Sequence, residues 1–527
     1  MTPAAIQKQL WDVSLEELKE GECRGPFTAD QLDDRHPEGW LAAERFAVEQ
    51  KGKVRPCDNY AEFVHNCTSS SEETIDTDGP DAIVSGGRLW VGGLREDRKV
   101  FFRLSNGSTL EGTLHTSLTP ELVELLKARL IDLKRAYKQL ANNPRDAPFA
   151  IFGLKDPDGN WVFFEALVLG FGSRNAVMGF NLMARALRFI MNLGLLVPVT
   201  HFFDDFSQVE PEPFSDSNCE CVQWLLNLLG WQYKDGPEDL LPPSSCFTPL
   251  GVQLDFSHRG WVKVSNTAKR LAKIQSETTR LIDLPKIPHH DVESLVGVCQ
   301  FAEAQTSGRS GALVLQQVRR ALAGSAQSDF SELKARLSDL AEYSAAVAPR
   351  WIKLRRTNRP ILIFTDAAAD PGRVTVGGVL FDPERDVVEY FGAILAEETT
   401  APWFAEDKEQ VICQAELLAV PVAFCTWAHY LADRDAIVFV DNEPAKDALI
   451  HGISASAASS RMVRFSRLFC ARNAVGAWYE RVASPSNIGD APSRGRFDEM
   501  SRIGASQVTP VSPALEDPVV MRPFAVT

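Results

Sequence analysis

The sequence has few of the features that mark secreted, zinc-binding or membrane-spanning proteins. Its 10 cysteines include no Cys-x-x-Cys pair, so neither a zinc ribbon nor a disulfide scaffold is indicated. The N-terminus has no apolar stretch of the kind that a signal peptide needs. Gln414, Glu416 and His429 interrupt the apolar stretch at residues 412–432, which fits a buried helix better than a membrane span. We therefore expect an intracellular protein, cytoplasmic or nuclear, with no membrane partner.

What the sequence does have is enough apolar residues for several hydrophobic cores. At about 150 residues per domain, 527 residues with 45% hydrophobic content indicate three or four domains. The 55 Lys and Arg against 70 Asp and Glu give a net charge of −15. This balance argues mildly against a protein devoted to binding nucleic acid, but it allows an enzyme that uses acidic metal ligands. Internal repeats are absent from the sequence.

The charge is unevenly distributed along the chain. The first fifty residues hold 11 Asp and Glu against 5 Lys and Arg, a net of −6. Their apolar stretches at residues 10–13 and 39–47 suggest helices packed on something larger. Residues 259–356 reverse the sign, with 16 Lys and Arg against 9 Asp and Glu, a net of +7, in a mostly helical pattern. Such a segment is either a solvated face or a surface for an acidic partner.

Two adjacent acids, Asp204 and Asp205, stand between apolar strand formers. The pair Asp33–Asp34 has charged neighbours instead and is most simply a solvated turn. Two acids at the tip of a buried hairpin repel each other and lose hydration unless a cation lies between them. An exposed hairpin turn and a divalent metal site both remain open on this evidence.

A third acid, Asp132, strengthens the metal interpretation. It ends the apolar run Ala128-Arg-Leu-Ile-Asp132, and an aromatic residue, Tyr137, follows five positions later. Three carboxylates are hard oxygen ligands of the kind that Mg²⁺ prefers, with Mn²⁺ as the alternative ion. They suit two-metal phosphoryl transfer, in which one ion activates a 3′-hydroxyl and the other stabilises the leaving group.

These motifs resemble the fingers and palm of retroelement reverse transcriptases over residues 53–251. The matching stretches are Lys53-Val-Arg-Pro-Cys-Asp58, Asp132-Leu-Lys-Arg-Ala-Tyr137, Leu169-Gly-Phe-Gly-Ser-Arg-Asn-Ala-Val177, Phe202-Phe-Asp-Asp205 and Phe247-Thr-Pro-Leu-Gly251. The resemblance implies that Lys53 and Arg55 contact the triphosphate and that Gly170 lies at the nucleotide and template. It also implies that Tyr137 excludes a ribose 2′-hydroxyl, and that Phe247–Gly251 is the primer grip.

The chain departs from the family pattern at several positions. Phe202 replaces the commoner Tyr, Val168 replaces a Pro, and Arg174–Asn175 replaces a small residue followed by Pro. Lys234 matches a lysine that assists the pyrophosphate leaving group, but Lys234-Asp-Gly-Pro237 also reads as a turn, which we favour.

A second set of acids recurs near the C-terminus at Asp366, Glu416, Asp441 and Asp490. Each alone is simply explained as a helix cap or a strand-end turn. Together, over residues 360–496, they resemble the four-carboxylate set of the ribonuclease H fold, which implies a two-metal site that activates water. One departure is Pro421, which lies five residues after Glu416 and predicts a kinked or shortened helix.

The combined order resembles DIRS-type and dinoflagellate-type retrotransposon polymerases. The resemblance implies a multidomain α/β and α+β chain, a right-hand polymerase followed by a ribonuclease H-like mixed sheet. We expect an acidic N-terminal extension (1–50), fingers and palm (51–255), a basic helical thumb and connection (256–357), the ribonuclease H-like domain (358–500) and a mobile tail (501–527).

The implied function is a nucleotidyltransferase that makes DNA from RNA, combined with an endoribonuclease that degrades the RNA of the hybrid. Each site would use two Mg²⁺, and the partners would be an RNA template, a DNA primer, the RNA–DNA hybrid and dNTPs. The alternatives are a host-adopted or decayed remnant that binds nucleic acid without polymerising, and a structural protein whose acids are surface caps. No Asp-Thr/Ser-Gly protease motif and no integrase zinc pattern is present in the sequence.

Overall fold

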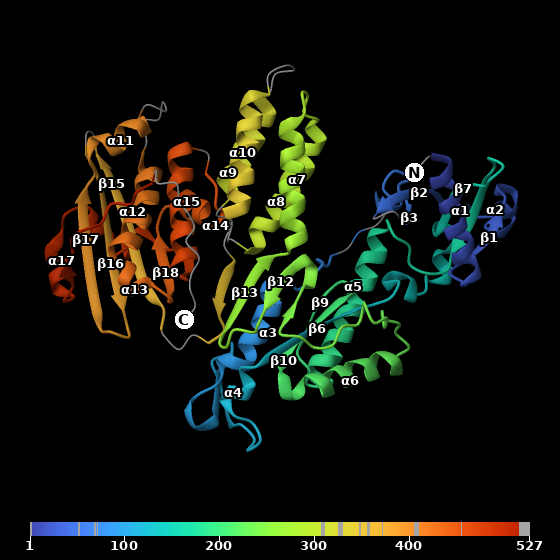
Figure 1. Ribbon diagram of the computed structural model, residues 1–527, viewed down its shortest axis with the longest axis horizontal. Helices are drawn as coiled ribbons and strands as arrows, with labels where there is room; N and C mark the ends of the chain where they lie inside the picture. The colour runs from blue at the N-terminus through green and yellow to red at the C-terminus, as the bar shows by residue number, and fades with distance from the viewer. Residues whose placement is uncertain are drawn as a thin grey trace. The chain divides into compact units, whose positions relative to one another are not determined.

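The computed structural model describes residues 3–50, 53–67, 70, 72–306, 311–324, 330–346, 349–355, 359–370, 373–404, 411–454 and 456–515 (Figure 1). The chain forms two compact units of mixed helix and strand, which are treated separately below. The first contains residues 1–90 and 114–249, and the second contains residues 91–113 and 250–527. The boundary at 249–250 precedes the expected end of the palm at 255. The expected thumb and ribonuclease H-like parts share the second unit, together with the hairpin β4 (Lys99–Arg103) and β5 (Thr109–Thr113).

A five-stranded sheet forms one part of the first unit. Its order is β1 (Cys23–Phe27), β8 (Trp161–Ala166), β7 (Ile151–Lys155), β2 (Ala42–Gln50) and β3 (Lys53–Asp58). Helix α1 (Pro3–Lys19) packs its Leu10 into the same core as Phe152 and Phe164 of the sheet. A helix at residues 10–13 is thus confirmed. The first fifty residues are nevertheless not a separate extension, since β1 and β2 belong to the sheet that contains β3.

The expected helix at residues 39–47 is wrong, because this stretch contains most of strand β2. Ala43 and Arg45 are buried and alternate with the exposed Glu44 and Phe46, which is the period of a strand. The leucines after Pro120, at positions 122, 125, 126 and 130, have the spacing of a helix, and the helix that this spacing predicts is also largely wrong. Helix α4 (Pro120–Val123) is short, and strand β6 (Leu126–Asp132) follows it.

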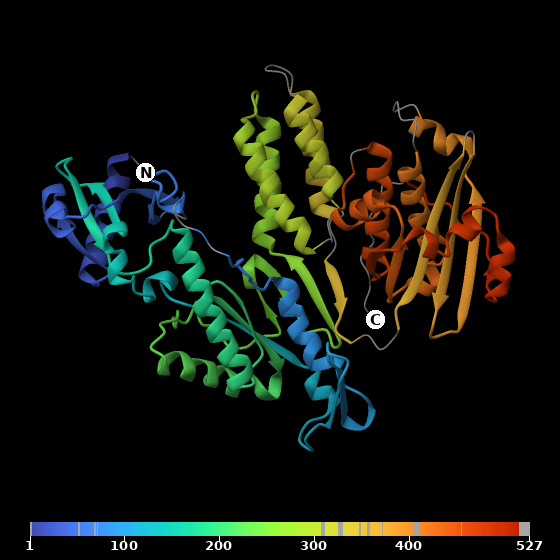
Figure 2. The ribbon, with the colours of Figure 1, turned by 180° about the vertical axis from the view of Figure 1, so that it is seen from behind.

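The second part of the first unit is a three-stranded antiparallel sheet of order β6, β10 (Asp205–Pro211) and β9 (Val199–Phe202). Helices α5 (Arg174–Phe189) and α6 (Glu212–Leu228) lie along it (Figures 1 and 2). Ile131 and Phe206 on the strands pack with Phe180 of α5 and Leu226 of α6 in one core. The acids Asp132 and Asp205 stand at the ends of two neighbouring strands of this sheet.

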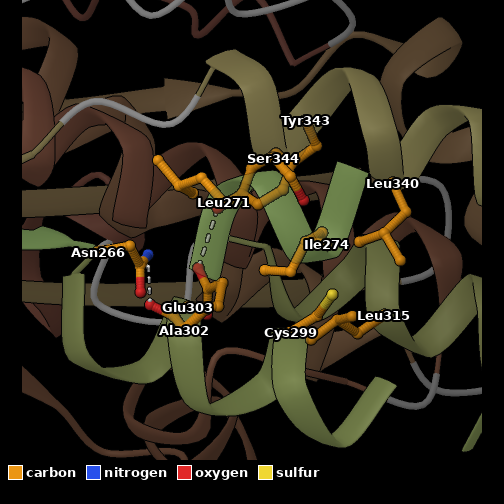
Figure 3. A pocket seen from close by; sticks show the side chains of 10 residues that line it. All are labelled: Asn266, Leu271, Ile274, Cys299, Ala302, Glu303, Leu315, Leu340, Tyr343 and Ser344. Atoms are coloured by element: carbon orange, nitrogen blue, oxygen red, sulfur yellow. Dashed lines mark hydrogen bonds between the residues drawn. The ribbon is translucent and has the colours of Figure 1, made fainter. Parts of the chain in front are cut away.

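From residue 250 on, the second unit forms strand β12 (Val252–Asp255), which pairs with β13 (Trp261–Asn266), and β13 pairs in turn with β14 (Arg350–Lys353). The expected helical segment is confirmed as α7 (Ala268–Asp283), α8 (His289–Thr306), α9 (Ala312–Gly324) and α10 (Ser331–Ala346). These helices enclose a cavity of about 20 Å³, room for roughly one water (Figure 3). The buried Glu303 carboxylate lines it and accepts a hydrogen bond of 3.0 Å from the Tyr343 hydroxyl. The bundle therefore has a polar group within its apolar core.

The C-terminal part of the second unit is a six-stranded mixed sheet. Its order is β19 (Gly476–Arg481), β18 (Asp435–Val440), β15 (Ile361–Asp370), β16 (Arg373–Asp382), β17 (Val387–Ile394) and β20 (Ser506–Gln507). The core around Ile363 and Val438 includes side chains of α12 (Ile412–Thr426), α14 (Glu443–His451) and α15 (Ala457–Arg472). The short helices α16 (Asp490–Ser493) and α17 (Phe497–Arg502) pack with Val379 and Tyr390 in a separate cluster. The mixed sheet confirms the mixed α/β architecture expected for this part of the chain.

Two expectations for this part need correction or comment. The segment after Ser501 is not wholly a mobile tail, because β20 pairs with β17 and the Val508 amide donates to the Tyr390 carbonyl at 2.9 Å. Residues 516–527 lie outside the described residues. Helix α12 runs through Pro421 to Thr426, so the proline does not end it. Among the described residues, no helix is both long and apolar enough to cross a membrane.

Candidate active sites

The first carboxylate group lies at the open end of the three-stranded sheet. In the antiparallel register, Asp205 pairs with Asp132 on one side and with Phe202 on the other. Phe203 has a φ of 52° and makes the turn between β9 and β10, which leaves Asp204 at the hairpin tip. The Asp204 carbonyl accepts a hydrogen bond of 3.0 Å from the Leu133 amide. Sheet pairing thus holds the backbones of all three acids together, whereas Asp33 and Asp34 lie exposed on helix α2 (Ala29–Arg35).

The three acids influence one another's ionisation. Burial, and then the charges of Asp204 and Asp132, raise the pKa of Asp205 to about 6. Burial is also the main cause that raises the pKa of Asp204, and the Asp132 charge adds to it. Carboxylates that resist ionisation in this way gain most from a bound cation. The donor set fits Mg²⁺, which prefers carboxylate oxygen.

Lys234 joins this site, although its sequence context favoured a simple turn. Its ammonium group forms an ion pair with the Asp132 carboxylate, and its backbone amide donates to the Asp132 carbonyl at 2.9 Å. Burial alone would lower the pKa of Lys234, but the hydrogen bond and charge of Asp132 outweigh it and raise the pKa. Lys234 is therefore a charged neighbour of the acids that spacing alone did not identify.

Tyr137 lies in the short 3₁₀ turn η3 (Ala136–Gln139), which follows β6 by three residues. Its ring packs against Phe171 at 5.0 Å and Phe180 at 4.8 Å between centroids. Burial, and then the Asp204 charge, raise the pKa of Tyr137. Tyr137 is therefore close enough to Asp204 to be affected by its charge.

The stretch Leu169–Val177, which we call the glycine-centred motif, packs against the end of strand β3. A Cβ on Gly170 would lie 3.2 Å from the Asp58 carboxylate, and one on Gly172 would lie 2.1 Å from the Asp58 carbonyl oxygen. Gly172 also has a φ of +108°, so it is the more constrained of the two glycines. Arg55 on β3 is exposed, and its positive charge favours the ionised form of Asp204. This effect is smaller than that of burial, so the pKa of Asp204 is still raised. Lys53 begins β3, but its side chain lies outside what the structure describes.

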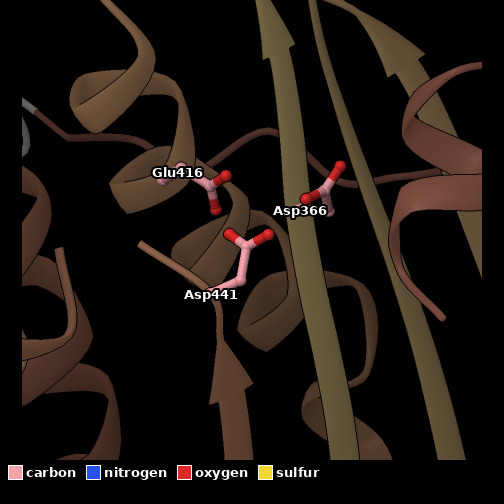
Figure 4. A group of neighbouring side chains, drawn as sticks. All are labelled: Asp366, Glu416 and Asp441. Carbon is pink, nitrogen blue, oxygen red and sulfur yellow. The ribbon is translucent and has the colours of Figure 1, made fainter. Parts of the chain in front are cut away.

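The second carboxylate group belongs to the six-stranded sheet (Figure 4). Asp366 lies on β15, Glu416 lies on α12, and Asp441 follows the end of β18. One oxygen from each lies within 4.8 Å of the others. Burial, and then the charges of Asp366 and Asp441, raise the pKa of Glu416 well above its usual value. Glu416 Oε2 is buried and has no hydrogen-bond partner, which together with the three carboxylates fits a hard divalent cation.

The fourth predicted acid, Asp490, stands apart from this group. It opens helix α16 and forms ion pairs with Arg494, at 2.5 Å, and with Arg496. Its charge, after burial and the charge of Asp441, contributes to raising the pKa of Asp366 to about 6. The structure therefore brings three of the four acids together and places the fourth beside them, bound to two arginines.

Two further residues contact Asp366 directly. The buried Ser493 hydroxyl donates to Asp366 Oδ2 at 2.5 Å, and the Asn487 amide donates to Asp366 Oδ1 at 3.3 Å and to the Thr365 carbonyl at 3.0 Å. A Cβ on Gly377 would lie 2.3 Å from the Ser493 amide nitrogen, so only glycine allows this approach. Asn487 and Ser493 lie within the stretch Asn487-Ile-Gly-Asp490-Ala-Pro-Ser-Arg494, which surrounds the fourth predicted acid, and that stretch was the one signal for them in the sequence.

Comparisons with known proteins add little to this geometry. No family model matches the chain. No curated protein matches its sequence. The chain is similar to the foamy viral protease–reverse transcriptase dRH in complex with double-stranded DNA, with a TM-score of 0.49 and 12% identity, covering 91% of this chain and 70% of that chain.

A second similar structure is the foamy viral protease–reverse transcriptase in complex with double-stranded DNA. Its TM-score is 0.48 with 13% identity, covering 90% of this chain and 82% of that chain. Likeness at this level carries no argument about activity, so the proposals below rest on the chain's own residues.

Proposed function

We propose that this chain is an RNA-directed DNA polymerase that also cleaves the RNA strand of an RNA–DNA hybrid. The observation that carries the proposal is the presence of two carboxylate groups, each built around a different sheet. Asp132, Asp204 and Asp205 form one group, and Asp366, Glu416 and Asp441 form the other. Each supplies the hard oxygen ligands that two-metal phosphoryl transfer requires.

In the polymerase site, the acids would hold Mg²⁺, which when bound supplies activation of the primer hydroxyl and stabilises the leaving pyrophosphate. Lys234 orients Asp132 and supplies a positive charge beside it. Arg55 on β3, together with Lys53, is proposed to contact the triphosphate. Tyr137 is proposed to pack against the deoxyribose and to leave no room for a 2′-hydroxyl. The specificity for deoxynucleotides would then follow from ring packing alone.

In the hydrolytic site, Asp366, Glu416 and Asp441 would hold Mg²⁺, with Asp490 as the fourth carboxylate. Ser493 and Asn487 keep the Asp366 carboxylate in a fixed orientation through their hydrogen bonds. Cleavage of the RNA strand complements DNA synthesis, because both reactions act on one hybrid. The net charge of +7 at residues 259–356 supports a role in gripping the duplex backbone by counterion release.

The partners would be an RNA template, a DNA primer, the resulting hybrid and dNTPs, and the source would be a retrotransposon of the DIRS or dinoflagellate type. The sequence motifs, from Lys53-Val-Arg-Pro-Cys-Asp58 to Asn487-Ile-Gly-Asp490, support this narrower assignment. The altered glycine-centred motif keeps a nucleic-acid-binding remnant as the competing interpretation.

The decisive experiment scores both activities of the full chain on one labelled RNA–DNA hybrid with Mg²⁺, and with Ca²⁺ as the non-catalytic control. Asp204→Asn should lose primer extension and retain hybrid cleavage, and Asp441→Asn should do the reverse. Asp34→Asn and Asp447→Asn, which change exposed carboxylates, are the matched controls. A folded parent that binds the hybrid but neither extends nor cleaves it is a remnant, and the proposal is then wrong.

A further inference from the structure

A network of buried ion pairs joins helix α1 to both sides of Tyr137. We define the network as Glu17, Glu22, Arg45, Asp58 and Lys138. Glu17 and Arg45 are 3% and 6% exposed. Buried charges are tolerated only when they are paired, so each member constrains the positions of its partners. The network lies wholly in the first unit and does not include the three acids of the polymerase site.

One branch of the network holds the turn that contains Tyr137. The ammonium group of Lys138, the next residue in the chain, contacts the Glu17 carboxylate and lies 2.9 Å from Glu22 Oε2. On the other side of the tyrosine, the guanidinium of Arg135 lies 3.0 Å from the same Glu22 oxygen. The residues on both sides of Tyr137 thus form ion pairs with Glu22, in the turn that follows α1, and Lys138 also pairs with Glu17 of α1.

The second branch holds the ring that faces Tyr137. Arg45 donates to Glu17 Oε2 at 2.7 Å and to Asp58 Oδ1 at 2.7 Å. The Asp58 amide donates in turn to the Phe171 carbonyl at 3.2 Å. Phe171 then packs edge to face on Tyr137, at 5.0 Å between centroids. Glu17 is the member that both branches share.

The charges of the network allow its two branches to be separated by a change at one residue, Glu17. Burial would raise the pKa of Glu17, but the charges of Arg45 and Lys138 outweigh it and lower the pKa, so this carboxylate is ionised. Without Glu17, Arg45 would keep Asp58 and Lys138 would keep Glu22. Loss of Glu17 would therefore uncouple the two branches without leaving either cation unpaired.

We infer that Glu17 is a positioning residue that fixes Tyr137 relative to Phe171 and thereby sets the discrimination between deoxyribonucleotides and ribonucleotides. The inference rests on the proposed polymerase function and on Tyr137 as the residue that meets the sugar. The simpler alternative is that the network only fastens α1 to the five-stranded sheet. In that case its loss would lower stability or overall rate and would leave sugar discrimination unchanged.

The test compares Glu17→Gln with the parent chain in primer extension, with kcat/KM measured separately for a dNTP and the matching NTP. Gln keeps the shape of Glu but removes the charge that both cations share. We expect the dNTP-to-NTP ratio of kcat/KM to fall roughly fivefold, mainly through a lower KM for the NTP. Glu16→Gln, on the exposed side of the same helix, is the matched control and should keep the parent ratio.

A second comparison shows whether Glu17 acts through Tyr137. In a Tyr137→Ala background, Glu17→Gln should leave the ratio unchanged, because residues that act through one contact are not additive. Equal losses of kcat/KM for both nucleotides, or an undiminished effect in the Tyr137→Ala background, would overturn the inference. If Glu17→Gln does not fold, Glu22→Gln is used instead, because Glu22 pairs with both Arg135 and Lys138. An unchanged dNTP-to-NTP ratio in that variant would also overturn the inference.

Failure of the inference and failure of the proposed function give different results. A parent chain that extends primers and rejects NTPs, with no change in Glu17→Gln, overturns the positioning role alone. A folded parent chain that extends no primer overturns the polymerase proposal and the inference together.

Discussion

Asp132 and Asp205 lie directly opposite each other in the antiparallel pairing of β6 and β10. Opposite residues of such a pair point to the same face of the sheet, so two carboxylates compete for the same space. The pairing of adjacent strands fixes this arrangement over seven residue pairs, from Asp205↔Asp132 to Pro211↔Leu126. The repulsion between the two carboxylates is offset by the positive charge of Lys234 and, in our proposal, by bound Mg²⁺.

Replacing Lys234 by Gln should slow primer extension while hybrid cleavage persists. The substitution removes the ammonium group that pairs with Asp132, which leaves this carboxylate free to rotate and removes the cation that contacts it. We expect kcat to fall by about tenfold to a hundredfold, the usual range for losing a group that orients a metal ligand. Lys134→Gln, at an exposed position two residues after Asp132, is the control. Equal extension by parent and Lys234→Gln would show that the ion pair has no catalytic role.

Tyr137→Ala should relax the rejection of ribonucleotides. The ring is held between Phe171 and Phe180, and its removal opens space where a 2′-hydroxyl would lie. Tyr137→Phe should keep the parent discrimination, because the ring and not its hydroxyl is expected to exclude the ribose. The measurement is the ratio of kcat/KM for dNTP and NTP. A ratio that does not change in Tyr137→Ala would remove this residue from the sugar-binding space.

The sequence predicted two groups of acids because most of them follow an apolar run. In the second group the structure brings Asp366, Glu416 and Asp441 together, whereas Asp490 pairs with two arginines. Asp366 and Asp441 mark strands β15 and β18, whose β-branched residues are visible in the sequence itself. The helical reading of the leucines after Pro120 failed because strand pairing with β10 overrides local spacing. Strand and helix compete most closely where apolar residues are frequent, as they are here.

Contacts between residues far apart in the chain were beyond the sequence. Lys234 meets Asp132 across 102 positions and Ser493 meets Asp366 across 127. The Lys234-Asp-Gly-Pro237 pattern gave no sign of the ion pair, since a turn and a functional lysine share it. Likewise, the sequence predicted that Asp366 and Asp490 would both be metal ligands of one site, whereas Asp490 forms ion pairs with Arg494 and Arg496.

Ser493→Ala should reduce hybrid cleavage without affecting primer extension. The Ser493 hydroxyl donates to Asp366, and its loss both frees the carboxylate and removes a hydrogen bond that lowers its pKa. We expect a fall of about tenfold in the cleavage rate at neutral pH, and a smaller fall as the pH rises and Asp366 ionises fully. Ser501→Ala, an exposed serine on α17, is the control. A cleavage rate equal to the parent's at all pH values would contradict this role for Ser493.

A separate prediction concerns Glu210, a buried acid on β10 outside both carboxylate groups. Its side chain is fully buried, and Oε1 has no hydrogen-bond partner while Oε2 accepts from Asn218 at 3.3 Å. Burial raises the pKa from 4.5 to about 7, and the opposing effects of Asn218 and Arg129 do not offset it. The folded chain therefore keeps a proton on Glu210 at pH values where the unfolded chain has lost it.

The sign of the pH effect follows from this difference. Where the folded state binds more protons than the unfolded state, stability falls as pH rises, here between about pH 4.5 and 7. Above that range, ionised Glu210 costs about 3 kcal/mol. Glu210→Gln is neutral at every pH, so it should stabilise the chain at pH 8 and have little effect at pH 5. Urea-induced unfolding of the full chain at both pH values measures this, with exposed Glu220→Gln as the control. The same shift in midpoint at both pH values would show that Glu210 does not titrate in this range.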